Sequence, residues 1–455
     1  MKVIIIGAGE VGYHIADILS REGADTVIID KNEERLHEIS EELDIQTIVG
    51  SGSSPEVLRR ADMANADMVV AVTDSDETNM IACLLASTQS RIPIRIARIR
   101  NPELDENNPL FKGEHLNIDL CINPEREAVN HLMDRLEFPG ASEVLGFAGG
   151  LVRLLGFAID PEAAVVGKRL IELRAMTPPG FKVLITSMVR DEKILVPMAS
   201  TEIRAGDYIF AVTDAARVRE LLNFFGKDTE PPRRVMIIGG GNTGLMLAEH
   251  IEKRGIPTKI IEKRRDRCEQ LATLLEKAIV LQGDGTRQDL LREEHIEDTD
   301  FFIAVTNDEE ANILGALLAK QLGAKNVISL IRKIDYIPLV TRFGIDGVIN
   351  PRHAAISRIL HFIRKGKIIS ATPIRDEKAE VFEFIALETS DITNRPLKDI
   401  RFPKGTIVGA IVRGKEIIIP DGASVILAGD HVVIFTPHSA IPQLQSLLTV
   451  KLEYF

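Results

Sequence analysis

The sequence repeats itself over about half its length, and this duplication constrains the fold more than any other feature. Residues 3–12 read VIIIGAGEVG and residues 235–244 read VMIIGGGNTG, so the first glycine recurs after 232 positions (239 minus 7). Further matches follow in the same order: Asp30 with Glu262, Gly50 with Gly283, Ala71-Val72-Thr73 with Ala304-Val305-Thr306, Asn79 with Asn312, and Arg98 with Arg332. The offset reaches only 234 (332 minus 98). We therefore interpret the chain as two copies of one module.

Each copy begins with apolar runs that alternate with helical patterns. In the first copy these runs are Val3–Ile6, Thr26–Ile29, Gln46–Val49, Met68–Val72 and Ile94–Ile99. Strands that are apolar throughout and separated by helices belong to parallel sheets covered on both faces. The sequence therefore predicts an α/β fold with two tandem Rossmann-like, doubly wound parallel sheets.

Each copy continues into a smaller region with short β-branched runs. The turn at 205–207 reads AGD before one run, and the turn at 428–430 reads AGD before its counterpart. Short strands with Gly-Asp turns, closed by a helix such as Ala216–Phe225, predict a small α+β unit. Four domains are expected, with a Pro-rich, charged linker at 227–234 between the halves. Their predicted limits are residues 1–130, 136–226, 232–360 and 368–455.

The glycine-rich turns indicate phosphate binding. Gly7 permits the tight strand-to-helix turn, Gly9 lets the backbone approach a pyrophosphate, and Gly12 lets the helix pack closely on the strand. Phosphates then lie at the helix N-terminus, where free N–H groups and the helix dipole stabilise an anion. One such motif is a weak signal, but here it follows a strand, opens a helix and occurs twice. We expect one nucleotide site in each copy.

An acidic residue follows the last glycine of each motif by 18 positions (30 minus 12, and 262 minus 244). Asp30 and Glu262 thus stand where a carboxylate accepts hydrogen bonds from the adenosine ribose. A 2'-phosphate would meet that carboxylate as a like charge, so NAD(H) or an ATP/ADP-type ligand is favoured over NADP. A solvated loop carboxylate beside Lys31 or Lys263 is the alternative. The basic cluster at 263–265 keeps a phosphate-binding role open in the second copy.

Other loops are expected at the same edge of each sheet. The segments GSGS at 50–53 and GDGT at 283–286 follow the third strand and would leave room for an adenine ring. The loops 73–77 and 306–310 follow the fourth strand, although their Asp, Ser and Asn residues also suit ordinary helix capping. Arg98 and Arg332, near the ends of the fifth strands, could reach a phosphate or form surface ion pairs.

Composition excludes several partners. A net charge of -12, without a basic cluster interleaved with aromatic residues, argues against nucleic acid. The most apolar stretch, residues 144–159, is interrupted by Arg153 and several glycines and is too short to span a bilayer. The sequence enters its first strand directly without a signal-peptide pattern, so we expect a cytoplasmic protein.

The paired GxGxxG motifs, the segments AVTDSDETNM and AVTNDEEANI, and the units AGDYIF and AGDHVVIF together resemble the TrkA family. That family comprises cytoplasmic NAD-binding regulatory subunits of Trk-type potassium uptake systems, built from two tandem RCK (KTN) modules. The resemblance implies a non-enzymatic gating ring, a homotetramer or homodimer, peripheral on the inner face of the cell membrane. Its partner would be a separate potassium-translocating subunit. Its ligands would be NAD(H) or ATP/ADP, and no catalytic or metal-ligating residue is implied.

The resemblance also assigns site residues by position. The first site would hold Gly7, Ala8, Gly9, Glu10, Val11, Gly12, Asp30, Ser51, Gly52, Thr73 and Arg98. The second would hold Gly239, Gly240, Gly241, Asn242, Thr243, Gly244, Glu262, Asp284, Thr306 and Arg332. Single-module relatives often carry Asp where this chain has Ser51, so the two sites are expected to treat the adenosine end or a cation differently.

Two alternatives stay open. An NAD-dependent dehydrogenase would need a domain that supplies a proton donor and substrate clamps beside the nicotinamide. The ten histidines are scattered, and none recurs in both copies near a strand end. A regulatory subunit of a potassium efflux system is the other alternative.

Overall fold

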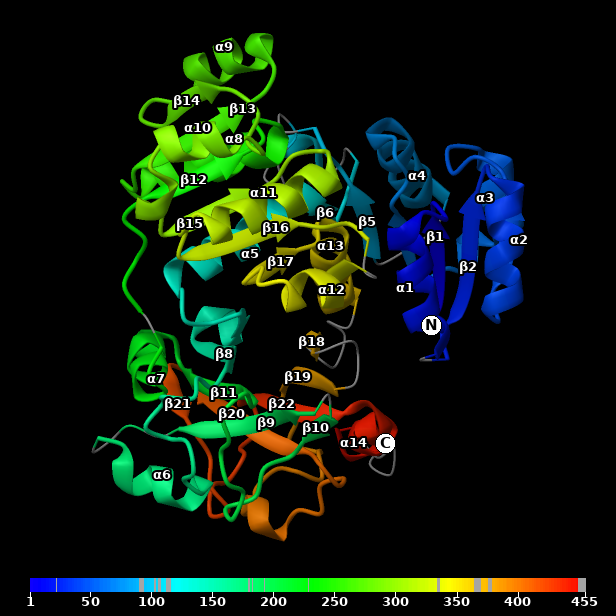
Figure 1. Ribbon diagram of the computed structural model, residues 1–455. Helices are drawn as coiled ribbons and strands as arrows, with labels where there is room; N and C mark the ends of the chain where they lie inside the picture. The colour runs from blue at the N-terminus through cyan, green and yellow to red at the C-terminus, as the bar shows by residue number, and fades with distance from the viewer. Residues whose placement is uncertain are drawn as a thin grey trace.

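The computed structural model describes residues 1–21, 23–89, 94–101, 104, 108–111, 116–178, 181, 183–191, 193–227, 229–333, 336–363, 370–374 and 379–448. These residues form two six-stranded and two five-stranded sheets. The larger sheets lie in the upper part of Figure 1 and the smaller ones below them. The predicted fold class, two Rossmann-like units each followed by an α+β unit, is confirmed.

The first large sheet has the order β3-β2-β1-β4-β5-β6, with every pair parallel. Its strands are β1 (Lys2–Ile6), β2 (Asp25–Asp30), β3 (Gln46–Val49), β4 (Met68–Ala71), β5 (Ile94–Arg98) and β6 (Leu120–Ile122). Its helices are α1 (Glu10–Arg21), α2 (Glu33–Glu42), α3 (Pro55–Arg60) and α4 (Asp76–Gln89). The strand order reverses between β1 and β4, which opens a crevice at the carboxyl ends of these strands. All five expected strands are present, and β6 is an addition.

The apolar runs follow from burial on both faces of this sheet. In β1, Val3 and Ile5 belong to the core under one helical layer, whereas Ile4 and Ile6 belong to the core under the other. All four side chains are at most 1% exposed. A strand between two helical layers therefore needs no polar alternation.

The second large sheet repeats this order as β14-β13-β12-β15-β16-β17. Its strands are β12 (Val235–Ile238), β13 (Thr258–Glu262), β14 (Ile279–Gln282), β15 (Phe301–Ala304), β16 (Asn326–Leu330) and β17 (Gly347–Ile349). Its helices are α8 (Asn242–Lys253), α9 (Arg265–Leu274), α10 (Gln288–Glu293), α11 (Glu309–Gln321) and α12 (Ile337–Arg342).

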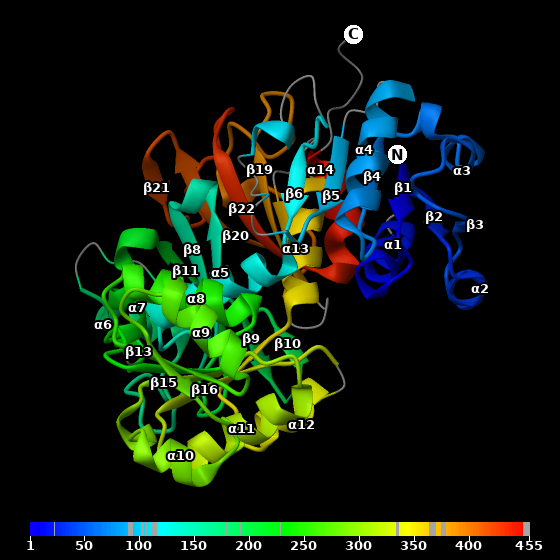
Figure 2. The same ribbon diagram turned by 90° about the horizontal axis from the view of Figure 1, so that it is seen from above.

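The two large units exchange their last helices, which are α5 (Pro124–Glu137) and α13 (Pro351–Ile363). Helix α13 packs on α1 and β6 of the first unit, as Figure 2 shows, and α5 packs on α8 and β17 of the second. The first core thus gains Ala355, Ile356, Ile359 and Leu360. The second core gains Ala128, Val129, Leu132, Met133 and Leu136. The domain limits given above stand as our proposal, with the limit at 130 inside an exchanged helix.

The small sheets are antiparallel in every described pairing. The first contains β7 (Glu143–Phe147), β8 (Val152–Ala158), β9 (Leu184–Arg190), β10 (Lys193–Leu195) and β11 (Tyr208–Asp214). The second contains β18 (Ser370–Ile374), β19 (Ala379–Ile385), β20 (Ile407–Arg413), β21 (Glu416–Ile418) and β22 (His431–Pro437). Helices α6 (Leu170–Met176), α7 (Val218–Phe224) and α14 (Ile441–Leu448) flank them. One apolar cluster, including Phe210 and Phe435, joins the two sheets, so the small units also form a pair.

The repeated Gly-Asp turns have a structural role. Both oxygens of Asp207 accept hydrogen bonds from Arg190, each at 2.7 Å, and Asp430 pairs in the same way with Arg413 at 3.0 and 2.8 Å. Each carboxylate is 2% exposed. Bidentate pairs of this kind fix the geometry of a buried turn.

Candidate functional site

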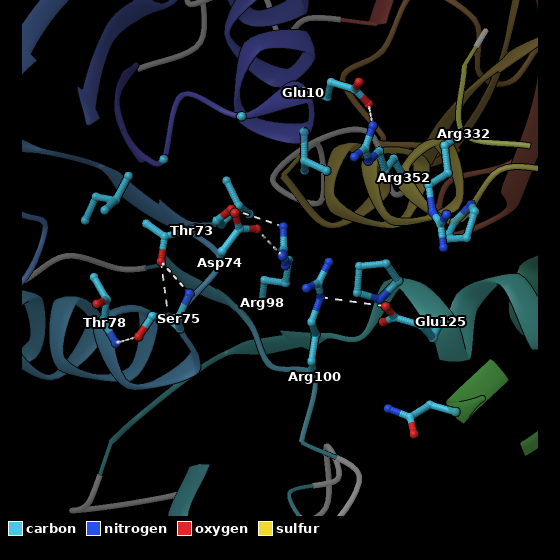
Figure 3. A pocket seen from close by; sticks show the side chains of 18 of the residues that line it. Glu10, Thr73, Asp74, Ser75, Thr78, Arg98, Arg100, Glu125, Arg332 and Arg352 are labelled. Atoms are coloured by element: carbon cyan, nitrogen blue, oxygen red, sulfur yellow. Dashed lines mark hydrogen bonds and ion pairs between the residues drawn. The ribbon is translucent and has the colours of Figure 1, made fainter. Parts of the chain in front are cut away.

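One cavity of about 890 Å³ lies between the two large units, and both glycine turns open on it. Figure 3 shows side chains of the two units converging there. The predicted residues that line it are Gly7, Gly9, Glu10, Val11, Asp30, Gly52, Thr73 and Arg98 from the first unit, and Gly241, Asn242, Thr243 and Arg332 from the second. Those that do not line it are Ala8, Gly12, Ser51, Gly239, Gly240, Gly244, Glu262, Asp284 and Thr306. The two predicted sites therefore open on one cavity, which is lined by eight predicted residues of the first site and four of the second.

Two glycines of each motif are required by the turn itself. Gly7 has a φ of +109°, and a Cβ there would lie 2.9 Å from the backbone nitrogen of Thr73. A Cβ on Gly12 would lie 1.9 Å from the carbonyl oxygen of Gly7. Gly239 and Gly244 repeat both constraints. These four positions explain the turn and do not by themselves indicate a ligand.

The middle glycine of each motif has no such structural reason. A Cβ on Gly9 or Gly241 would meet no described atom within 4 Å, and neither residue has a positive φ. Both glycines line the cavity at the start of α1 and α8. The space that a side chain would fill is the space that a pyrophosphate needs at a helix N-terminus.

The two acidic residues tie the second strand to the glycine turn. Asp30 accepts from the N–H of Ala8 at 2.6 Å and from the N–H of the residue two positions after Asp30 itself at 2.9 Å. Glu262 accepts in the same way from the N–H of Gly240 and from the N–H of the residue two positions after Glu262 itself, both at 2.8 Å. Each carboxylate oxygen keeps a lone pair that can accept from a ribose hydroxyl. Their assignment as ribose ligands is compatible with this geometry and remains a prediction.

An arginine pair was missed in the sequence. Arg35 donates to the carbonyl of Ala8 at 3.4 Å, and Arg267 donates to the carbonyl of Gly240 at 2.6 Å. The two arginines are 232 positions apart (267 minus 35), the offset of the glycine motifs, and this match could have revealed them. Arg35 reaches its glycine turn from α2, and Arg267 reaches the other turn from α9. Arg267 also lines the cavity.

A buried asparagine holds the loop after the fourth strand in each unit. Asn79 accepts from the N–H and hydroxyl of Thr73 at 2.9 and 2.7 Å, and donates to its carbonyl at 3.1 Å. Asn312 makes the same three bonds with Thr306. Both asparagines are 0% exposed. The recurrence of Asn79 as Asn312 in the sequence thus reflects a shared loop scaffold.

The same asparagines correct one match between the copies. Asn79 also donates to the carbonyl of Arg98 at 2.8 Å, whereas Asn312 donates to the carbonyl of Leu330 at 3.1 Å. Arg98 pairs with Ile122 in the sheet, as Leu330 pairs with Ile349. Arg98 therefore corresponds to Leu330, 232 positions away (330 minus 98), and its match with Arg332 was wrong.

The true counterpart of Arg332 is Arg100. Its N–H donates to Asp76 at 2.9 Å, as the N–H of Arg332 donates to Glu309 at 3.2 Å. The error arose because the first copy carries two arginines, separated by one residue, where the second carries one. The strand register and the asparagine hydrogen bonds together decide between them.

Arg98 is the most buried of the cavity's basic side chains. It is 6% exposed and bonds to Asp74 at 2.8 Å, while its Nε has no partner among the described residues. Burial, together with the charge of Arg100, lowers the pKa of Arg98. A buried guanidinium with a free N–H suits an anionic ligand. Arg332 is only half-buried and bonds to the carbonyl of Asn307 at 3.0 Å.

The cavity carries an excess of positive charge. Its basic residues are Lys31, Arg98, Arg100, Arg264, Arg267, Arg332 and Arg352. Its acidic residues are Glu10, Asp30, Asp74 and Glu125. The excess of three (7 minus 4) stands in a chain of net charge -12, so the cavity favours an anion where the rest of the surface does not.

The loops after the third strand differ in charge. Ser51 shares a hydrogen bond of 2.9 Å with the hydroxyl of Ser53. Asp284 accepts from the hydroxyl of Thr286 at 2.6 Å and pairs with Lys263 at 3.1 Å. Hydrogen bonds from Thr286 and Lys263 lower the pKa of Asp284 to about 2. The second unit therefore holds a fixed negative charge where the first has none.

Comparison with known proteins identifies the family. The TrkA-N domain matches residues 3–124 and 235–351, and the TrkA-C domain matches residues 154–226 and 381–449. The Trk system potassium uptake protein TrkA of Halomonas elongata is 40% identical over 100% of both chains. Duplicated Rossmann-type units around one basic cavity thus define a two-module protein. The chain belongs to the TrkA family, as its motifs indicated.

Solved structures agree on the fold. The GsuK RCK domain covers 98% of this chain and 94% of its own, with a TM-score of 0.61 at 16% identity. The GsuK channel bound to NAD covers 98% of this chain and 78% of its own, with the same TM-score. Among the described residues of the present chain, no helix is long and apolar enough to cross a membrane.

Proposed function

We propose that this chain is the regulatory subunit of a Trk-type potassium uptake system. Adenine nucleotides bound at its glycine turns would control potassium movement through a separate membrane subunit. The observation that carries this proposal is the placement of both turns on one basic cavity between units that exchange helices. The names of the relatives, Trk system potassium uptake proteins, supply the transport system.

NAD(H) and ATP or ADP are the proposed ligands. The open space beside Gly9 and Gly241 supports a site for phosphates, and the positive charge of the cavity favours an anionic ligand. Asp30 at the cavity wall disfavours a 2'-phosphate, so NADP is expected to bind less tightly. The NAD-bound GsuK channel, a structure of the same fold, supports this ligand class.

The shared cavity provides a means of control. A ligand between two units changes their relative position only if it binds one arrangement more tightly than the other. Moving an equilibrium from 1:99 to 99:1 takes about 5.5 kcal/mol. A homodimer of this chain would hold four sites, and a tenfold preference of about 1.4 kcal/mol at each would supply about 5.6 kcal/mol. A ring of two or four chains, peripheral on the cytoplasmic face of the membrane, is therefore proposed.

A regulatory role accords better with the cavity than hydride transfer does. The described residues that line it include no histidine, cysteine or tyrosine that could protonate a substrate beside a nicotinamide. Its polar side chains are mainly arginines and carboxylates engaged with each other or with the backbone. We propose that the chain is not an enzyme.

The test is potassium flux through a Trk membrane subunit reconstituted with this chain. Gly9→Val and Gly241→Val place a side chain in the phosphate space, where an added Cβ meets no described atom within 4 Å. Both complexes should therefore assemble and lose their response to NADH and ATP. Gly422→Val is the control, because a Cβ there makes only an ordinary contact far from the cavity, 3.4 Å from Lys398. Unaltered nucleotide responses in both cavity variants would refute the proposal. Response only with a potassium efflux partner would assign the chain to that system.

A further inference from the structure

Arg352 belongs to the second unit by sequence but lies over the glycine turn of the first. It is the second residue of the exchanged helix α13, and its guanidinium forms an ion pair with Glu10, the first residue of α1. Figure 3 shows this pair at the edge of the cavity. Both residues line the cavity beside Gly9, with 40% and 50% of their side chains exposed.

The matching residue of the other exchanged helix has the opposite charge. Asn123 and Asn350 precede α5 and α13, and their amides donate to the carbonyls of Arg100 and Arg332 at 3.3 and 3.1 Å. A proline follows each asparagine, so Glu125 stands where α13 carries Arg352. Helix α5 packs on α8, which begins with the uncharged Asn242. The helix that packs on α8 thus carries a carboxylate, paired with Arg100 at 3.7 Å, where the helix that packs on α1 carries a guanidinium.

The end of the fifth strand differs in the same sense. Arg98 of the first unit lines the cavity and pairs with Asp74 at 2.8 Å, whereas its counterpart in the second unit is Leu330. In both comparisons the cation stands at the first turn, supplied once by the second unit and once by the first. Two carboxylates oppose these cations: Glu10, at the start of α1, pairs with Arg352, and Asp74 pairs with Arg98.

We propose that Arg352 and Arg98 form a subsite for the terminal phosphates of a nucleoside di- or triphosphate at the first glycine turn. A phosphate there takes the guanidinium of Arg352 from Glu10, and a residue of the second unit then holds a ligand of the first. The second turn, which faces Glu125 and Leu330, discriminates less between nucleotides with one and three phosphates. This inference rests on the proposed function, since it requires adenine nucleotides at these turns.

Titration calorimetry on variants with one working turn tests the subsite. In a Gly241→Val background only the first turn binds, and Arg352→Gln should lower ATP affinity there about tenfold or more, since it removes a charge-assisted hydrogen bond to phosphate. AMP lacks the terminal phosphates, so its affinity should fall by less than about threefold. Arg352→Lys should restore part of the ATP affinity because it keeps the charge. Thermal unfolding without nucleotide checks that each variant is folded.

The matched control uses the other exchanged helix. In a Gly9→Val background, Glu125→Gln should raise or maintain ATP affinity at the second turn. In the Gly241→Val background, Glu10→Gln should raise ATP affinity at the first turn by freeing Arg352. Equal losses of ATP and AMP binding in Arg352→Gln, or no loss, would overturn the subsite while the proposed function stands. A folded wild-type chain that binds neither ATP nor NADH would instead overturn the proposed function.

Discussion

The two glycine turns share a scaffold and differ in the charges around it. In both units a buried asparagine fixes the loop after the fourth strand, and a carboxylate bonds to the glycine turn. The differences lie at Arg98 against Leu330 and at Arg352 against Glu125, all of which line the cavity. Residues that form the turn are thus repeated, whereas these four residues of the cavity wall differ in charge. The loops at Ser51 and Asp284, which do not line the cavity, also differ in charge. These differences predict that the two turns treat nucleotides differently.

The largest expected effect is on stability, and it distinguishes glycines that the turn requires from glycines that leave space for a ligand. Gly12→Ala places a Cβ 1.9 Å from the oxygen of Gly7, so the free energy of unfolding should fall by about 3 kcal/mol or more. Gly9→Ala, three residues away, adds a methyl group to open space and should change it by less than about 0.5 kcal/mol. Urea denaturation measures both. Similar losses in the two variants would mean that the open space at Gly9 is not available to a ligand.

The next effect concerns the two carboxylates. Asp30→Ala should lower nucleotide affinity at the first turn about tenfold, and Glu262→Ala should do so at the second, because each removes a charge-assisted hydrogen bond to ribose. The ratio of NADP to NAD affinity should rise in Asp30→Ala. Calorimetry on variants with one working turn gives both quantities. Unchanged affinity in both variants would leave these carboxylates with their bonds to the glycine turns as their only role.

The smallest effect is a difference in acid sensitivity between the loops after the third strand. Asp284 has a pKa of about 2 in the fold against 3.8 for the free group, so its contribution to stability is complete above about pH 4 and disappears as the pH falls towards 2. With 34% of the side chain exposed, solvent screening limits this contribution to less than about 1 kcal/mol. Asp284→Ser, which copies Ser51, should flatten the stability profile in that pH window. An unchanged profile would mean that its bonds to Thr286 and Lys263 do not persist in solution.

The strands and turns could be predicted because their signals are local. Apolar runs, glycine spacing and the repeat offset placed β1 to β5 and both turns, but β6 has only three residues and gave no periodic signal. The exchange of α5 and α13 could not be predicted, because an amphipathic pattern indicates that a face is buried without indicating against which unit. Arg352 was missed for the same reason. Its role depends on a helix that crosses to the other unit, and no spacing within one copy records that crossing.

The exchanged helices also bear on how such a chain could have originated. A half-chain ending near residue 226 would expose the apolar face of α5 and would lack the four α13 residues that fill the first core. It could satisfy both needs only by pairing with a second copy of itself. Duplication within one chain converts that obligate pair into a covalent one, whose halves are always present in equal number and whose association does not depend on concentration. It also frees each half to change alone, which an identical pair cannot do, and the opposite charges of Arg352 and Glu125 are a difference that only a duplicated chain can carry.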